Sequence, residues 1–177
     1  MKILVIYNSQ TGFTKKYAEW ISQESGAECL DFKQAKKMKA EKLSQYDSIV
    51  YGCWVMANSF KNLSWFQKKV SALAGAGKKL FVYTVGGSPA GSPEILNAMK
   101  KNFSCQEWQG VQTFYFPGGL NYEKMKGFPK FILKSFVKAF SKKKDATEEE
   151  QKLAQMLSHS FDISDKEYIK PLLENLK

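Results

Sequence analysis

Residues 5–18 decide the fold of this 177-residue chain, and they read VIYNSQTGFTKKYA. A short apolar run enters a hydroxyl-rich turn with Gly12, and Tyr17, Ala18 and Ile21 then recur at helical spacing. Such a strand–turn–helix gathers main-chain N–H groups, hydroxyl groups and the positive end of the helix dipole at one point. We therefore predict an anion site formed by Ser9, Gln10, Thr11, Gly12, Phe13 and Thr14.

The turn around Gly12 differs from two other phosphate-binding loops. No Gly-Lys-Ser/Thr sequence follows it, as a Walker loop requires, and its glycine does not belong to a G-x-G-x-x-G motif. The sequence therefore argues against magnesium-dependent nucleotide hydrolysis. It favours an anion that is held by main-chain amides and hydroxyl groups.

Short runs of β-branched and aromatic residues recur along the chain and alternate with amphipathic helical segments. Buried parallel strands have such continuous apolar sequences. The expected strands cover residues 3–7, 28–31, 48–51, 80–85 and 113–116. This alternation predicts an α/β fold with a doubly wound, five-stranded parallel sheet and helices on both of its faces.

The segment after the fifth strand is too long for an ordinary loop. We predict a single domain over residues 1–177, with a helical insertion at residues 118–162. One helix is expected at about 129–142, and a second follows the capping-box sequence at residues 147–150. A terminal helix is expected to begin at residues 164–167, or nearer Pro171, because a proline inside a helix costs about 3 kcal/mol.

The residues of the first strand, turn and helix are similar in register to the flavodoxin signature. The matching positions are Tyr7, Ser9, Gly12, Thr14, Ala18 and Ile21. This resemblance implies a flavodoxin-like sheet of strand order 2-1-3-4-5 and FMN as the cofactor, with its phosphate gripped by this loop. The alternative is an ordinary Ser/Thr-rich turn between a strand and a helix.

Two further loops are expected beside the first, because ligands of doubly wound sheets bind at the carboxyl ends of the strands. By the resemblance, these loops enclose the FMN ring. One face of the ring is assigned to Cys53, Trp54, Val55, Met56 and Ala57, and the other side to Thr84, Val85, Gly86, Gly87 and Ser88. A flat indole suits stacking on a flat ring, so Trp54 is the expected partner, and packing of Trp54 under a loop is the alternative.

A narrower resemblance covers the rest of the chain. Residues 117–122 read PGGLNY, and a Phe- and Lys-rich helix, an acidic segment and a terminal helix follow. This order resembles the flavodoxin-like, menaquinone-dependent protoporphyrinogen oxidases, which implies porphyrinogen oxidation and electron transfer to a membrane quinone. The chain departs from that family at residues 56–59, where an Arg-Tyr-Gly-His sequence is expected, and this favours a relative with another substrate.

The positive charge is concentrated in the expected insertion. All 27 basic residues are Lys, and eight of them lie between Lys124 and Lys144, a stretch without acidic residues. One helix face is expected to carry Lys130, Lys134, Lys138 and Lys142, and an apolar stripe to carry Phe128, Phe131, Ile132, Phe136, Val137 and Phe140. Such a helix can lie on an anionic membrane surface, dock to an acidic redox partner, or pack on the domain with a solvated Lys face. The absence of Arg argues against sequence-specific DNA reading. The helical alternation of Lys and Phe differs from the basic and aromatic residues spread over a sheet or groove that bind single strands, so we expect no nucleic-acid partner.

The cysteine and histidine content excludes several kinds of site. Cys29, Cys53 and Cys105 are far apart in the sequence, and His159 is the only histidine. We therefore expect neither a zinc site nor a catalytic triad. The sequence also shows no signal peptide and no apolar run long enough to span a bilayer, which predicts a cytoplasmic protein, at most peripheral to the inner face of the membrane.

These observations predict a redox protein in which FMN exchanges electrons with a small molecule or a protein. Whether the chain is an enzyme or an electron carrier stays open at this point. A protoporphyrinogen oxidase-like enzyme at the membrane surface is one alternative. A module that retains the fold and docks to lipid or to a partner without redox chemistry is another.

Overall fold

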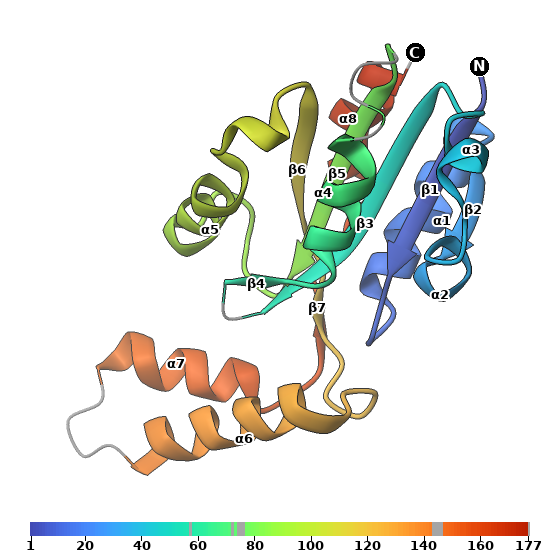
Figure 1. The fold of residues 1–177 in the computed structure, drawn as a ribbon. Helices are drawn as coiled ribbons and strands as arrows, with labels where there is room; N and C mark the ends of the chain where they lie inside the picture. The colour runs from blue at the N-terminus through green and yellow to red at the C-terminus, as the bar shows by residue number, and fades with distance from the viewer. Residues whose placement is uncertain (57, 72, 74–76, 143–146, 177) are drawn as a thin grey trace.

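The computed structural model describes residues 1–56, 58–71, 73, 77–142 and 147–176. Its centre is a parallel sheet of the order β2-β1-β3-β5-β6 (Figure 1). The strands are β1 (Ile3–Asn8), β2 (Glu28–Asp31), β3 (Ser48–Met56), β5 (Lys79–Gly86) and β6 (Val111–Pro117). Counted along these five strands, the order is the predicted 2-1-3-4-5, and the doubly wound α/β fold is confirmed.

Helices cover both faces of the sheet. One face packs on α1 (Phe13–Ser25) and α8 (Lys170–Leu176), whose buried residues share a core with β1, β3 and β5. The other face packs on α4 (Leu63–Ser71) and α5 (Pro93–Phe103), together with the short helices α2 (Phe32–Ala35) and α3 (Ala40–Leu43). A 3₁₀ turn at Gln106–Trp108 leads into β6. The two cores hold the sheet between two layers, so its carboxyl edge is a fixed platform for loops.

The third strand is longer than the sequence predicts. The apolar run predicts an end at Tyr51, but β3 continues to Met56, and its last two residues pair antiparallel with the two-residue strand β4 (Ser59–Phe60). Asn58, in the turn between them, has φ 61°, a left-handed conformation that asparagine adopts more readily than most residues. The segment that was expected to be a loop is therefore mainly a hairpin.

A glycine in the middle of β3 makes room for an aromatic ring. A Cβ atom on Gly52 would lie 2.0 Å from the ring of Tyr83 on the neighbouring strand. This close approach lets the Tyr83 hydroxyl reach across the sheet and donate a 2.9 Å hydrogen bond to the main-chain oxygen of Thr14. The core thus anchors the first turn of α1.

The segment after β6 forms a helical hairpin beyond the carboxyl edge of the sheet (Figure 1). Its helices are α6 (Gly127–Lys142) and α7 (Glu148–Leu157), close to the two helices that the sequence predicts. Two short strands, β7 (Gly119–Leu120) and β8 (Phe161–Asp162), pair antiparallel where the chain leaves and rejoins the sheet domain. We call residues 118–126 and 158–165 the base of the insertion.

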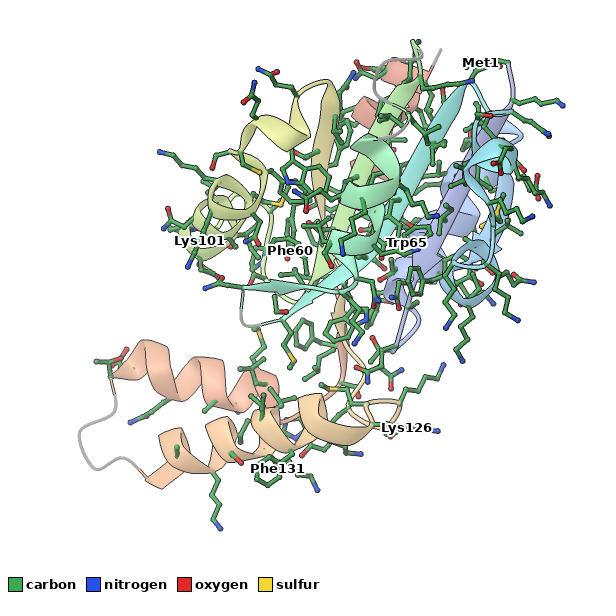
Figure 2. All side chains as sticks on the ribbon, in the orientation of Figure 1. Met1, Phe60, Trp65, Lys101, Lys126 and Phe131 are labelled. Carbon is green, nitrogen blue, oxygen red and sulfur yellow. The ribbon has the colours of Figure 1, made fainter. Side chains whose placement is uncertain are left out.

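The observed faces of α6 differ from the predicted division of this helix into an apolar face and a lysine face. The sequence places Phe131 in the apolar stripe, but its side chain points away from the sheet domain (Figure 2) and is 66% exposed. It lies on the side of the helix that also carries Lys134 and Lys138. Seven residues span about two helical turns, so positions 131 and 138 necessarily share a side. Leu133, which is not part of the predicted stripe, is buried. The side chains of Phe128, Phe136, Phe140 and Lys142 lie outside the described part of the structure.

The terminal helix begins later than its capping-box sequence indicates. The Asp165 carboxylate accepts a hydrogen bond from the Glu167 N–H and starts a 3₁₀ turn over Lys166–Ile169. The α-helix α8 then starts at Lys170, which places Pro171 in its first turn. A proline is tolerated there because its missing N–H would have no partner within the helix. The alternative start near Pro171 is the one that the structure adopts.

Candidate functional site

The three predicted loops meet at the carboxyl edge of the sheet. In the register of the sheet, Asn8 pairs with Cys53, and Cys53 pairs with Thr84. The ends of β1, β3 and β5 therefore lie next to each other, with β1 and β5 on either side of β3. Asn8 also donates a side-chain hydrogen bond of 3.0 Å to Asn62, the residue before α4. This edge is where doubly wound sheets bind ligands.

The first loop has the geometry of an anion site. Gly12 is the N-cap of α1 and has φ 109°, a conformation that side-chain-bearing residues rarely adopt, and no side chain caps the helix. The Ser9 hydroxyl accepts a 3.1 Å hydrogen bond from the Gly12 N–H and so shapes the turn. No atom lies within 4 Å of a Cβ built at Gly12. The space beside Gly12 is thus open and no side chain occupies the cap position of α1, as binding of a phosphate requires.

The other predicted residues of this loop divide into two groups. Thr14 is almost fully buried, and its main-chain oxygen accepts the hydrogen bond from Tyr83. Ser9, Thr11 and Phe13 are half-buried, and Gln10 is exposed. The structure therefore brings the six predicted residues together, with Thr14 as the anchor of the turn. Their contact with a cofactor stays a prediction.

In the second loop, only some of the residues predicted to bind the cofactor are accessible to solvent. Cys53 is fully buried in the core, and burial raises the pKa of its thiol far above the usual value. Trp54, on the opposite face of β3, is half-buried, and the Lys61 ammonium lies 5.7 Å from the centre of its ring. Val55 and Met56 are also half-buried. Ala57 lies outside the described residues.

The third loop is shaped by a tyrosine of the neighbouring strand. Tyr115 on β6 donates a 2.7 Å hydrogen bond from its hydroxyl to the main-chain oxygen of Ser88. A Cβ atom on Gly86 would lie 2.9 Å from that hydroxyl, so the glycine permits the close approach. Gly87 and Ser88 are half-buried.

Two residues at the end of β5, Thr84 and Val85, are buried and face the core. Like Cys53, they can contact a ligand at this edge only through main-chain atoms. Their side chains position the strand ends.

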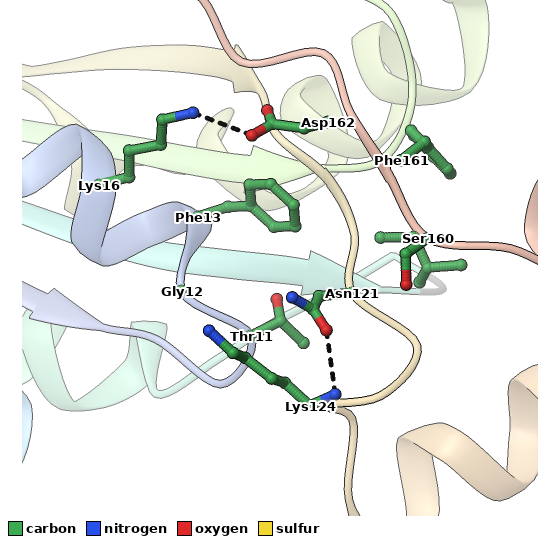
Figure 3. A pocket seen from close by; sticks show the side chains of 10 residues that line it. Thr11, Gly12, Phe13, Lys16, Asn121, Lys124, Ser160, Phe161 and Asp162 are labelled. Atoms are coloured by element: carbon green, nitrogen blue, oxygen red, sulfur yellow. Dashed lines mark hydrogen bonds and ion pairs between the residues drawn. The ribbon is translucent and has the colours of Figure 1, made fainter.

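Sequence reasoning missed a second wall of the site, which the base of the insertion provides. A cavity of about 410 Å³ lies between the first loop and this base (Figure 3). Its lining residues are Thr11, Gly12, Phe13, Lys16, Leu120, Asn121, Lys124, Ser160, Phe161 and Asp162. No local pattern indicates this arrangement, because it joins positions more than 100 residues apart in the chain.

Polar contacts tie the base of the insertion to α1 and to the first loop. The Lys16 ammonium donates hydrogen bonds to the Asp162 carboxylate at 2.9 Å and to the Ser164 hydroxyl at 2.7 Å. Partial burial alone would raise the pKa of Asp162, but hydrogen bonds from Ser164 and Lys16 outweigh it and hold the pKa below its usual value. Gln10 donates a 3.2 Å hydrogen bond to the main-chain oxygen of Lys126. These contacts fix the second wall opposite the first loop.

The described residues contain neither a metal-binding cluster nor a helix that could span a membrane. No group of three or more His, Cys, Asp or Glu side chains is arranged to hold a metal ion within that part of the chain. Among the described helices, none combines the length and the apolar composition that crossing a membrane requires.

The fold and the site define a doubly wound α/β protein with an anion-binding loop at the carboxyl edge of its sheet. The chain belongs to the flavodoxin domain family, whose model matches residues 4–148. It is accordingly a flavodoxin-like protein with FMN as its cofactor and electron transfer as its class of chemistry. The search of curated proteins gave no match.

Several solved structures resemble this chain. The Trp repressor binding protein of Bacillus subtilis is 20% identical with a TM-score of 0.48, covering 66% of this chain and 85% of that one. The two-electron reduced flavodoxin of Megasphaera elsdenii is 23% identical with a TM-score of 0.46, and the match covers 64% of this chain and 84% of that one. A flavoprotein of Lactobacillus acidophilus NCFM in complex with FMN is 15% identical with a TM-score of 0.39, and the match covers 66% of this chain and 91% of that one.

Proposed function

We propose that this protein is a redox protein in which the Ser9–Thr14 loop holds the phosphate of FMN and the loops after β3 and β5 hold its ring. The observation that carries the proposal is the uncapped start of α1 at Gly12, a residue that lies in the left-handed region and lines the cavity. A phosphate needs N–H donors and access, and this turn offers both. When bound, FMN supplies the redox chemistry by accepting and releasing electrons.

The protein groups have distinct roles in this proposal. Tyr83 holds the turn at Thr14, and Tyr115 holds the loop at Ser88, so both loops are preorganised. The half-buried indole of Trp54 is available to cover one face of the ring. Electrons would then pass to a small molecule or a protein at the uncovered edge. Porphyrinogen as the substrate stays a prediction of the narrower resemblance.

Reconstitution with FMN tests this function directly. We expect the purified protein to bind FMN stoichiometrically, to show the absorbance bands of a bound flavin, and to bind riboflavin more weakly, because riboflavin lacks the phosphate. The measurement is a titration followed by flavin fluorescence and visible absorbance. A protein that stays colourless and shows no binding with millimolar FMN would contradict the proposal.

The exposed side of α6 supports a second proposal, that the hairpin binds an anionic lipid surface. Phe131 is 66% exposed there, beside the exposed Lys134 and Lys138. Cations around an apolar side chain fit an interface between lipid headgroups and acyl chains. Lys130 is used differently, because its ammonium lies 5.2 Å from the centre of the Tyr122 ring. An acidic redox partner is the competing occupant of this side.

Charge reversal at Lys134 and Lys138 tests the lipid proposal. Each lysine near an anionic surface contributes about 1 kcal/mol, so Lys134→Glu with Lys138→Glu should lower the affinity for phosphatidylserine-containing vesicles at least tenfold. The matched control is Lys100→Glu with Lys101→Glu, two exposed positions on α5 with the same change of net charge. Co-sedimentation measures both pairs. An equal loss for the two pairs, or no binding by the wild type, would rule the proposal out.

A further inference from the structure

We propose that Lys124 and Asn121, both in the base of the insertion, complete the phosphate site of FMN. The insertion would then belong to the cofactor site itself. This inference rests on the proposed function, since it assigns further ligand contacts to the same phosphate. It adds an ammonium group and an amide group to a loop that, on its own, offers main-chain amides and hydroxyl groups.

The cavity places these two residues across from the first loop. Lys124 and Asn121 line the same cavity as Thr11 and Gly12. In Figure 3 the Lys124 side chain extends toward the loop at Thr11 and Gly12, and the amide nitrogen of Asn121 points the same way. The amide oxygen of Asn121 is already used, because it accepts a 3.0 Å hydrogen bond from the Lys124 main-chain N–H. That bond leaves the amide N–H groups of Asn121 available to a ligand. It also holds the main chain of Lys124 in position.

The two ammonium groups of the cavity differ in what they already bind. Lys16 is paired with Asp162 and Ser164, and its ammonium also lies 5.0 Å from the centre of the Trp20 ring. Lys124 makes no side-chain hydrogen bond or ion pair with any other described residue. Lys124 is therefore the cation of this cavity that is ready to pair with an anion.

The charges of the cavity favour an anion as its ligand. Lys16 and Lys124 face a single carboxylate, that of Asp162, which Lys16 already neutralises. The uncapped first turn of α1 adds a positive potential at Gly12. A phosphate monoester would thus contact main-chain N–H groups on one side and the Lys124 ammonium on the other. Such charge-assisted hydrogen bonds are stronger than neutral ones.

The position of Lys124 is held by contacts around it. Gln10 of the first loop donates to the main-chain oxygen of Lys126, two residues along the chain. Met125, between the two lysines, is buried, and its N–H donates a 3.1 Å hydrogen bond to the main-chain oxygen of Asn121. The turn that carries Lys124 is therefore attached to the loop that it faces.

Comparison of FMN with riboflavin isolates the phosphate contact. We expect Lys124→Gln to weaken FMN binding about fivefold, as for a partly solvated ion pair, and to leave riboflavin binding unchanged. Lys124→Arg should restore most of the affinity, because it keeps the charge. The FMN affinity of the wild type should fall with added salt more steeply than that of Lys124→Gln. Fluorescence titration of each protein with each flavin gives all of these values.

Lys126→Gln serves as the matched control. Lys126 is exposed and does not line the cavity, and its hydrogen bond with Gln10 uses a main-chain atom that the substitution keeps. The inference is wrong if Lys124→Gln binds FMN as the wild type does, or if it loses FMN and riboflavin affinity equally. A wild type that binds neither flavin would instead contradict the proposed function. The two failures are thus distinguishable.

Discussion

Gly12→Val is expected to weaken FMN binding at least tenfold, which corresponds to about 1.4 kcal/mol. The reason is conformational, because a Cβ at this position meets no atom within 4 Å. The backbone of Gly12 has φ 109° and ψ −23°, and a β-branched residue is strongly disfavoured there. A valine would turn the peptide units that precede α1 and move the N–H groups away from the phosphate. Fluorescence titration with FMN measures the effect.

A glycine at the other end of the same helix provides the control. Gly26 is the C-cap of α1, has φ 68°, and also has open space around a Cβ. Gly26→Val should therefore lower the free energy of unfolding, with a loss of about 1–2 kcal/mol, and leave FMN affinity unchanged. Urea unfolding of both variants separates stability from binding. If Gly12→Val retained wild-type affinity, or if both variants lost FMN equally, the assignment of the phosphate loop would fail.

Local sequence carries most of the information about the sheet and the first loop. The five main strands are apolar runs whose order follows from the resemblance, and the turn at Gly12 is encoded within a few residues. The Ser9 hydroxyl and the Gly12 N–H that it binds lie three positions apart. A site built from such short-range contacts can be predicted from the sequence alone.

The second wall could not be predicted in this way. Lys16 and Asp162 are 146 positions apart, and Gln10 and Lys126 are 116 positions apart, so no periodic pattern connects them. The extension of β3 to Met56 was missed for a related reason, because its hairpin depends on pairing with Phe60 and Ser59. Tertiary contacts decide such features, and sequence periodicity reports only which side of one element is apolar.

The side of α6 that carries Phe131 shows a further limit of prediction from the sequence. The sequence contains several Phe positions from which an apolar stripe can be drawn, and hydrophobicity alone does not choose among them. The structure buries Leu133 and exposes Phe131. Because α6 lies in a hairpin beyond the sheet and packs on α7, a large apolar residue on its outer side can remain in solvent. The exposed Phe131 is one of the observations that support the lipid proposal.

Gly119→Ala is expected to detach the insertion at its base while leaving the parallel sheet folded. A Cβ on Gly119 would lie 2.2 Å from the main-chain oxygen of Phe161, and the backbone has φ 142°. A backbone atom of the paired strand cannot move aside as a flexible side chain can, so the β7–β8 pairing must break. We expect a local loss of about 2–4 kcal/mol, because overpacking adds to backbone strain.

Hydrogen exchange can localise the effect of Gly119→Ala. The N–H of Ile163, which donates to the main-chain oxygen of Gly118 at 2.9 Å, should lose its protection, whereas amides of β3 and β5 should keep theirs. FMN affinity should fall as well, because Lys124 and Asn121 would lose their position opposite Gly12. Gly110→Ala is the matched control, since Gly110 also has a positive φ of 78° but has open space around a Cβ. Unchanged exchange at Ile163 would show that the base of the insertion does not depend on this glycine.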